Sequence, residues 1–425
     1  MKDIAEKSLF DIPGGWKTLL WILVILGIGM FIAGLMTGGE ESVVRTWQAF
    51  LINTVFWGGI AHAGVIFAVI WQITDAKWGR AFKRLAEACA GFLPISFLMF
   101  MVVFFGSHVL YEWTHTPFLH HGEAVKQGWL NLPFFISRNV FWLLLIYGIS
   151  YWFVKTSIKP DIALARRLIG SDWGGKFADW VLEDYGEHET EVIRLEKLSR
   201  KIAPVLAFVY SIGGSFLAWD FVMTLDQTWF STLFGVFVMI GNMHAFLGLM
   251  LVVAVTVRQK FGIEEYISIN RLHDLAKMTF AFSLLWTYMG YSQYIVIWYA
   301  DLPEETPYLI IRSMNAPWNT LFLVIILWVF VSVFLGLLPR TLCRMPNYIR
   351  LMGIWVMLGQ LLSVYIMVVP SLQHDGHYHI FMGMHELLIT LGFVGAFFLC
   401  YLAFLGKLPI LPISDKHLCR TWHGH

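Results

Sequence analysis

The sequence predicts an all-α integral membrane protein of about ten transmembrane helices, and three observations support this. Hydrophobic residues make up 58% of the 425 residues, whereas charged residues make up only 14%. A soluble domain carries about a quarter charged residues. Apolar runs of about 20 residues, each long enough to cross a bilayer as a helix, recur along the whole chain. The alternating pattern of a membrane β-barrel is absent, so backbone hydrogen bonding within lipid requires helices.

Four predicted spans precede the longest connection of the chain. They cover 17–37, 46–73, 86–110 and 133–155. The connection, 156–202, holds an amphipathic piece, an acidic piece that bears tryptophan, and a charged helical run. We expect it to lie along the membrane surface as a solvated cap, and a docking surface for another protein is the alternative.

Six predicted spans follow this connection, and we expect residues 1–425 to form a single polytopic membrane domain. These spans cover 203–223, 230–256, 274–299, 317–338, 347–370 and 378–405. Two loops on the side opposite the long connection, 111–132 and 300–316, are large enough to be buried under a partner, although neither could fold alone.

The distribution of basic residues predicts the orientation. With ten spans, 25 of the 30 lysines and arginines fall on the side that holds both termini, and Arg138 and Lys277 fall inside spans. The opposite loops hold only Arg45, Lys126 and Arg312. Because cytoplasmic loops are enriched in Lys and Arg, we expect both termini to be cytoplasmic. The first apolar run is too long for a cleaved signal peptide, and no convincing cleavage site follows it.

The positions of the cysteines and the net charge limit which cofactors and partners the chain is expected to bind. All four cysteines, Cys89, Cys343, Cys400 and Cys419, map to the predicted cytoplasmic side, where disulfides are rare. No motif for covalent haem or for an iron–sulfur cluster is present. We therefore expect no covalently bound cofactor and no cofactor held by a clear ligand motif. The net charge of +1 gives no indication of a nucleic-acid partner.

Polar side chains inside the apolar spans are the candidates for chemistry, because lipid does not solvate ionisable groups. They form an outer and an inner layer when the spans are aligned by depth. The candidates for a proton path are His62, Asp220, His244, Lys277, His385 and Glu386. The candidates for a quinol site are His108, Arg138 and Asp220, together with nearby aromatic rings.

Each candidate also has a purely structural interpretation. Arg138 and Asp220 could simply pair with each other. Asp274 and Lys277, three residues apart, favour a local ion pair on one helix. His62 and His244 could be neutral, hydrogen-bonded core residues, or could share a haem, although one pair at unmatched spacing is a weak haem signal. A metal site at the loop residues His115, His120 and His121 is similarly weak, since no cysteine or carboxylate stands at ligand spacing.

Two motifs resemble a known family. Residues 218–235, AWDFVMTLDQTWFSTLFG, and residues 286–306, WTYMGYSQYIVIWYADLPEET, resemble the polysulfide-reductase-like (NrfD/PsrC) membrane subunits. The second motif looks most like the ActF-type subunit of bacterial alternative complex III, a quinol:cytochrome c oxidoreductase, and its ADLPEET turn is the most specific element. The resemblance implies two four-helix bundles, spans 2–5 and 6–9, flanked by spans 1 and 10.

The resemblance also implies partners and ligands. It implies a hetero-oligomeric complex in the bacterial inner membrane with a second NrfD-like subunit, an iron–sulfur protein and c-type cytochrome subunits. It implies no haem or cluster in this chain, and quinol, menaquinol and membrane lipid as its ligands. The leading expectation is thus a respiratory-complex subunit that supports proton translocation or scaffolds it. A quinol-binding subunit that feeds an outer iron–sulfur protein is the alternative. A secondary transporter is a third interpretation, although paired Gly/Pro-interrupted spans are not evident.

Overall fold

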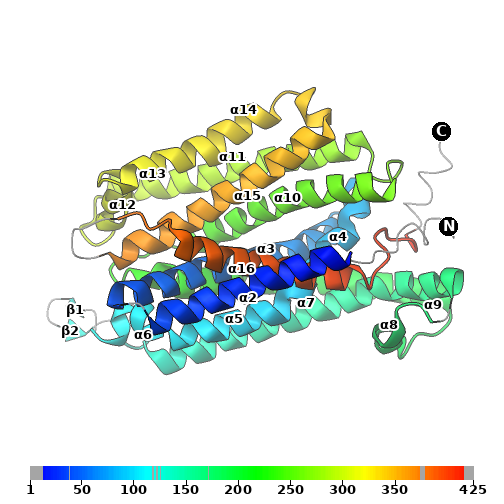
Figure 1. Ribbon diagram of the computed structural model, residues 1–425, viewed down its shortest axis with the longest axis horizontal. Helices are drawn as coiled ribbons and strands as arrows, with labels where there is room; N and C mark the ends of the chain where they lie inside the picture. Colours follow the sequence, from blue (N-terminus) through cyan, green and yellow to red (C-terminus); the bar gives the residue numbers. More distant parts are fainter. Residues whose placement is uncertain are drawn as a thin grey trace.

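A computed structural model shows long helices running side by side along the long axis of the molecule (Figure 1). It describes residues 13–37, 39–116, 119–120, 123–124, 126–170, 172–373 and 379–415. Nine helical segments among these residues are long and apolar enough to cross a membrane. Apart from one two-stranded hairpin, β1 (Leu119–His120) and β2 (Glu123–Ala124), the regular structure in the described residues is helical. The predicted all-α membrane fold is therefore confirmed.

The first bundle is built around a helix that is buried on all sides. This helix, α3 (Glu40–Ile73), has 94% of its most apolar stretch buried. The other members are the segment Lys77–Phe105, which ends in α5 (Leu93–Phe105), then α7 (Leu132–Ile169) and α9 (His188–Phe221). Since α3 also contacts the second bundle, it forms the centre of the protein.

The second bundle lies beside the first (Figure 1). Its members are α10 (Phe234–Phe261), α11 (Ile269–Ala300), α15 (Pro346–Val368) and a segment of three parts. That segment is α13 (Trp318–Ile325), the π-helix η5 (Ile326–Ser332) and α14 (Val333–Leu337). Helix α10 packs on α11 and α15, and also on α3 and α9, so it joins the bundles.

Helix α11 corresponds to the predicted span 274–299 but is not among the nine apolar segments. It is 32 residues long, which exceeds the length needed to cross a bilayer. Its sequence contains serine, threonine, glutamine and several tyrosines between the apolar residues, which lowers its hydropathy. The prediction of a tenth span therefore rests on the length of α11 and its packing within the bundle.

The first and last long helices flank the bundles as a pair. They are α2 (Gly14–Met36) and α16 (Met384–Leu405), which pack against each other over their length. They cross at two glycines: a Cβ added to Gly392 would lie 2.7 Å from the Cα of Gly27. Small residues let membrane helices approach this closely, so any side chain at this crossing would push the helices apart.

The predicted connection 156–202 is largely helical, and its charged run, which the sequence predicted to be helical, lies in the first part of α9. Helix α7 continues to Ile169, α8 covers Gly175–Leu182, and α9 already begins at His188. The charges of residues 190–202 predict that this run lies outside the lipid. They do not prevent a helix there, because charged side chains on a helix can be solvated by water. Arg200 bonds Glu196 at 2.8 Å on this part of α9, an i,i+4 pair that favours helix.

The two ends of the bundle differ in charge. The end where α7 and α10 finish carries Arg84, Arg258 and Arg344 and is called the basic end below. The opposite, or far, end carries the hairpin and the short helix α12 (Thr306–Ser313), on the left in Figure 1. Lys2, Lys7, Lys416, Arg420, Cys419 and His121, which entered the sequence predictions, lie outside the described residues.

Arg312 fixes α12 to the far end of α15. Its guanidinium donates to the carbonyls of Ile366 and Met367 at 2.9 and 3.0 Å and to the Ser371 hydroxyl at 2.6 Å. These carbonyls belong to the last turn of the helix, where backbone acceptors lack helical partners. Burial lowers the pKa of Arg312, and burial also raises the pKa of the neighbouring Tyr308 against the opposing effect of Arg312. An ordinary arginine pKa lies far above neutral.

Candidate functional site

At the far end of the first bundle, Arg138 of α7 and Asp220 of α9 form a buried ion pair. The guanidinium makes two hydrogen bonds to the carboxylate, Nε to Oδ2 at 2.7 Å and Nη2 to Oδ1 at 2.8 Å. Asn139 adds a third at 2.9 Å, and the Arg138 guanidinium lies 3.9 Å from the centre of the Trp129 ring. Both partners of the pair are almost fully shielded from solvent. The pairing that the sequence left open is therefore present.

His62 lies in the middle of the first bundle. Its ring meets the edge of Tyr147 with 4.8 Å between centroids, and the Tyr147 hydroxyl is 2.9 Å from the Ser96 hydroxyl. The Nε2 atom of His62 is buried and has no hydrogen-bond partner among the described residues. A cavity of about 40 Å³ borders His62 and Asn242. It has space for about three water molecules, which could hydrogen-bond to both side chains.

A second buried charge cluster lies at the basic end of the first bundle. Arg84 bonds the Asp161 carboxylate at 2.6 Å, contacts the Glu87 carboxylate, and donates to the Ser157 hydroxyl and carbonyl at 3.0 and 2.8 Å. Glu87 and Asp161 are fully buried. The Oε1 atom of Glu87 has no hydrogen-bond partner within the described part of the chain. The same oxygen lies 4.0 Å from the Lys83 ammonium, so Glu87 is flanked by two cationic side chains, Lys83 and Arg84.

A polar pocket of about 150 Å³ borders this cluster. Arg84, Ser157 and Ser199 line it, together with Asp415 and Ser414 from the segment after α16. Ser414 also holds the cluster directly, because its backbone N–H donates to Asp161 at 2.8 Å. The pocket therefore reaches Arg84, which bonds both buried carboxylates of the cluster.

Helix α7 contributes one residue to each of these three places. At 1.5 Å rise per residue, Tyr147 lies about 14 Å along α7 from Arg138, and Asp161 lies about 21 Å further. Tyr151, on the same helix between Tyr147 and Asp161, donates its hydroxyl proton to the carbonyl of Ala90 at 2.7 Å. We call this series the polar column, defined by Glu87, Asp161, Tyr147, His62 and Asp220.

Sequence reasoning found two members of the polar column and missed three. His62 and Asp220 were candidates, whereas Glu87, Asp161 and Tyr147 were not. A signal for Glu87 was present, because it is the only acidic residue in the predicted span 86–110. Asp161 was hidden because it fell in the predicted loop. Its inward position depends on α7 continuing past Pro160.

His244 occupies the corresponding depth of the second bundle. Its Nδ1 is 2.9 Å from the side-chain amide nitrogen of Gln360, which donates to it, so a neutral ring carries its proton on Nε2. That Nε2 is buried and has no partner among the described residues. His244 lies on α10, whereas His62 lies on α3. Within the described residues, no group of three or more metal-ligating side chains is present.

His385 and Glu386 lie at the far end of α16 and contact α3. His385 Nε2 is 2.8 Å from the Thr46 hydroxyl, and Arg45 Nε donates to Glu386 at 2.8 Å. Glu386 also accepts from the backbone N–H of Gly383 at 2.8 Å. Glu386 therefore caps its own helix and anchors α16 on α3.

A mainly apolar pocket of about 500 Å³ opens beside this pair, between α3, α15 and α16. Its polar members are Arg45, Gln48, Asn53, Glu386 and Thr390, and the hydroxyl-bearing Tyr365 also lines it. Asn53 donates to Thr390 at 2.9 Å, but its buried Oδ1 has no partner among the described residues. The pocket thus combines an apolar wall with an unused acceptor. We call it the α3–α16 pocket.

Two candidates lie at the surface. Lys277 pairs with Asp274 at 3.0 Å, with side chains 61% and 43% exposed, as the local ion-pair interpretation predicted. His108 is exposed and its ring contacts His115, with 5.1 Å between centroids. His115 itself bonds the His108 carbonyl at 2.8 Å. The structure therefore joins Arg138 to Asp220 but places His108 in a different environment.

No protein-family model and no curated protein matches this chain. The function is therefore argued from the buried polar groups and from the two motifs.

Proposed function

We propose that this chain is a non-redox membrane subunit of a quinol:cytochrome c oxidoreductase and that its first bundle carries protons. The observation that carries the proposal is the polar column. Buried ionisable groups stand at both ends of one bundle, and an unpartnered histidine beside a cavity stands between them. Ionisable groups inside a membrane protein are costly and mark ion or proton pathways.

The chemistry of the column suits proton transfer rather than binding of a permeant ion. A proton moves between carboxylates, imidazoles, hydroxyls and water. The first bundle supplies a carboxylate (Glu87), an imidazole (His62) and two hydroxyls (Tyr147 and Ser96). Water could occupy the cavity beside His62. The polar pocket at the basic end reaches Arg84, and Asp220 with Arg138 stands at the far end.

The orientation and partners belong to the same proposal. The excess of Lys and Arg at the basic end supports a cytoplasmic basic end with both termini on that side, in the inner membrane of a bacterium. The resemblance of residues 218–235 and 286–306 supports a complex with a second NrfD-like subunit, an iron–sulfur protein and c-type cytochromes. The far end, with α12 and the hairpin, would then face these redox subunits.

One purification tests the assignment to a respiratory complex. The native membrane is solubilised mildly, the tagged chain is captured, and its partners and visible spectrum are recorded. We expect c-type haem bands and iron–sulfur proteins to co-purify with the chain. A chain that purifies alone and binds a solute would contradict the proposal and support a transporter.

Quinol binding is a second candidate function, and the α3–α16 pocket favours it. An apolar pocket with a few placed polar groups is the usual form of a small-molecule site. The unpaired Asn53 Oδ1 is an acceptor that one quinol hydroxyl could use, whereas Glu386 already accepts from Arg45 and from the Gly383 N–H. The earlier candidate set is less suited, because Arg138 and Asp220 already satisfy each other. A tail could lie along the apolar wall.

A further inference from the structure

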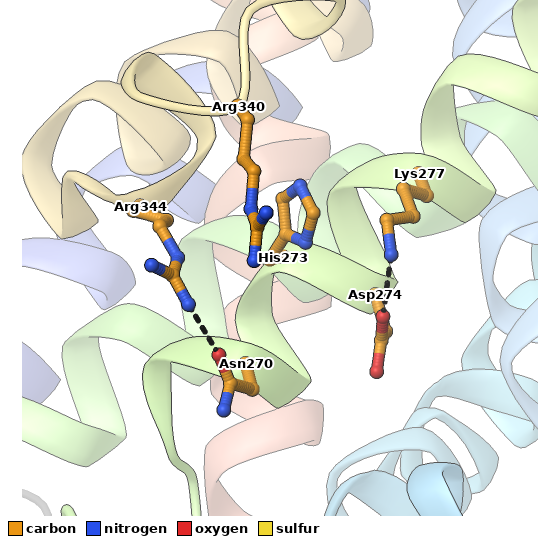
Figure 2. Close-up of a pocket in the computed structure, with 6 residues that line it drawn as sticks. All are labelled: Asn270, His273, Asp274, Lys277, Arg340 and Arg344. Atoms are coloured by element: carbon orange, nitrogen blue, oxygen red, sulfur yellow. Dashed lines mark hydrogen bonds and ion pairs between the residues drawn. The ribbon is translucent and has the colours of Figure 1, made fainter.

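Six polar side chains form an open pocket at the basic end of the second bundle, outside the polar column. Figure 2 shows Arg340 and Arg344 extending from the connection after α14 toward the first turns of α11. The α11 residues of this pocket, which has a volume of about 590 Å³, are Asn270, His273, Asp274 and Lys277. We call it the arginine pocket.

The arginine pocket carries unbalanced positive charge. Arg340, Arg344 and Lys277 are cationic, while the single carboxylate, Asp274, already bonds Lys277 at 3.0 Å. Arg344 donates one N–H to the neutral side-chain amide oxygen of Asn270, at 2.8 Å. Arg340 has no hydrogen bond or ion pair within the described part of the chain. Two guanidinium groups therefore lack an anionic partner.

The chemistry of these groups selects a phosphate or phosphodiester. Guanidinium groups present two parallel N–H donors that match the oxygens of such an anion. Figure 2 shows the two guanidinium groups on the same side of the pocket, with the His273 ring beside Arg340. Both arginines line the arginine pocket, so each could donate to an anion bound there.

The surroundings select a lipid as the source of that anion. Leu335 and Leu338, which lie five and two residues before Arg340, are 59% and 58% exposed. Leu284 and Leu285, two turns from Lys277 on α11, are exposed as well. Helix α11, and α14 with the connection that follows it, therefore present positive charge at the basic end and apolar surface along the span. A phospholipid has this arrangement of headgroup and acyl chains.

We propose that the arginine pocket binds the headgroup of an anionic phospholipid, with its phosphodiester against Arg340 and Arg344 and its acyl chains along α11 and α14. Basic pockets between transmembrane helices near one membrane surface bind anionic headgroups. The inference requires only that the chain spans a bilayer, so it stands apart from the proposed respiratory function.

The test compares the intact complex, or the chain as purified, with the variant Arg340→Gln/Arg344→Gln. The control is Arg194→Gln/Arg200→Gln, two exposed arginines at the basic end of α9 that each pair with a glutamate. Each protein is placed in mixed micelles that contain phosphatidylglycerol or phosphatidylcholine. The lipid retained per chain is counted by native mass spectrometry, and thermal unfolding confirms that each variant is folded.

We expect the wild type and the control to retain phosphatidylglycerol in preference to phosphatidylcholine. This preference should fall about thirtyfold in the arginine-pocket variant, since two cationic contacts are removed. An unchanged preference in that variant, or an equal loss in the control, would overturn the proposal. Displacement of phosphatidylglycerol by millimolar inorganic phosphate would also overturn it, because the pocket would then be a site for the free anion.

Discussion

Arg138 on α7 and Asp220 on α9 form a bidentate ion pair between neighbouring helices. The guanidinium donates from Nε and Nη2 to the two carboxylate oxygens at 2.7 and 2.8 Å. This bidentate pair joins α7 to α9 where both lie inside the bundle. Asn139 and the Trp129 ring complete the surroundings of the pair. Because each charge is buried, neither can lose its partner without a large cost.

Replacing Asp220 with Ala should therefore destabilise the protein strongly. The change leaves the Arg138 guanidinium buried without its counter-ion, and breaking such a pair costs about 3–5 kcal/mol. Denaturant or thermal unfolding of the purified protein measures this. The double variant Arg138→Met/Asp220→Leu should recover much of the loss, since no unpaired charge remains. Additive losses in the double variant would show that the two side chains do not act as a pair.

Replacing Gly27 with Leu should weaken the packing of α2 on α16. At this crossing the added side chain would overlap the Gly392 backbone, and overpacking costs about 1–3 kcal/mol. Gly29→Leu on the same helix is the matched control, because a Cβ at Gly29 meets nothing within 4 Å. Protease accessibility of α2, measured for both variants, should rise for Gly27→Leu alone. Equal behaviour of the two would contradict the close crossing.

Replacing Arg312 with Met should detach α12 from α15. The change removes the Arg312 donor from the buried carbonyl of Ile366 and leaves Met367 with a long hydrogen bond of 3.5 Å from the Ser371 hydroxyl, and each unsatisfied buried group costs about 1–3 kcal/mol. Hydrogen–deuterium exchange of 306–313 reports this locally, and we expect faster exchange there with little change in α7. Protection equal to the wild type would contradict the role assigned to Arg312.

The quinol-binding candidate predicts a specific pattern of kinetic effects. In the isolated complex, Asn53→Leu should raise the KM for quinol, because it removes an acceptor from the α3–α16 pocket. His108→Ala should leave that KM unchanged, since His108 is exposed and contacts His115. Steady-state quinol oxidation measures both. A raised KM in His108→Ala with an unchanged KM in Asn53→Leu would instead favour the quinol site predicted from the sequence, at His108, Arg138 and Asp220.

Much of the fold could be predicted from the sequence because lipid imposes a simple rule on length and hydropathy. The charged run after Thr190 shows the limit of this rule. Hydropathy predicts the boundary of the apolar part of α9, but the helix itself begins about 15 residues earlier, at His188. Gly27 and Gly392 show a second limit: they are far apart in sequence, and their contact follows only from the packing of α2 on α16.

The candidate site was predictable in part. His62 and Asp220 stood out because an ionisable group in an apolar run is unusual. Which groups share a bundle could not be predicted, because one residue of register turns a side chain by about 100° around a helix. His244 and His62 match in depth but belong to different bundles. Lys277 resembled a buried lysine in sequence and is mostly exposed in the structure.

The ratio of protons translocated to electrons transferred tests the central proposal most directly. The complex is reconstituted in liposomes with a pH-sensitive dye, and Glu87→Gln and His62→Leu are compared with the control Glu264→Gln, a glutamate of the second bundle's basic end whose side chain is 60% exposed. We expect electron transfer to continue in all three, and the ratio to fall in the two column variants alone. Wild-type ratios in both column variants, with the complex fully assembled, would contradict proton transfer through the first bundle.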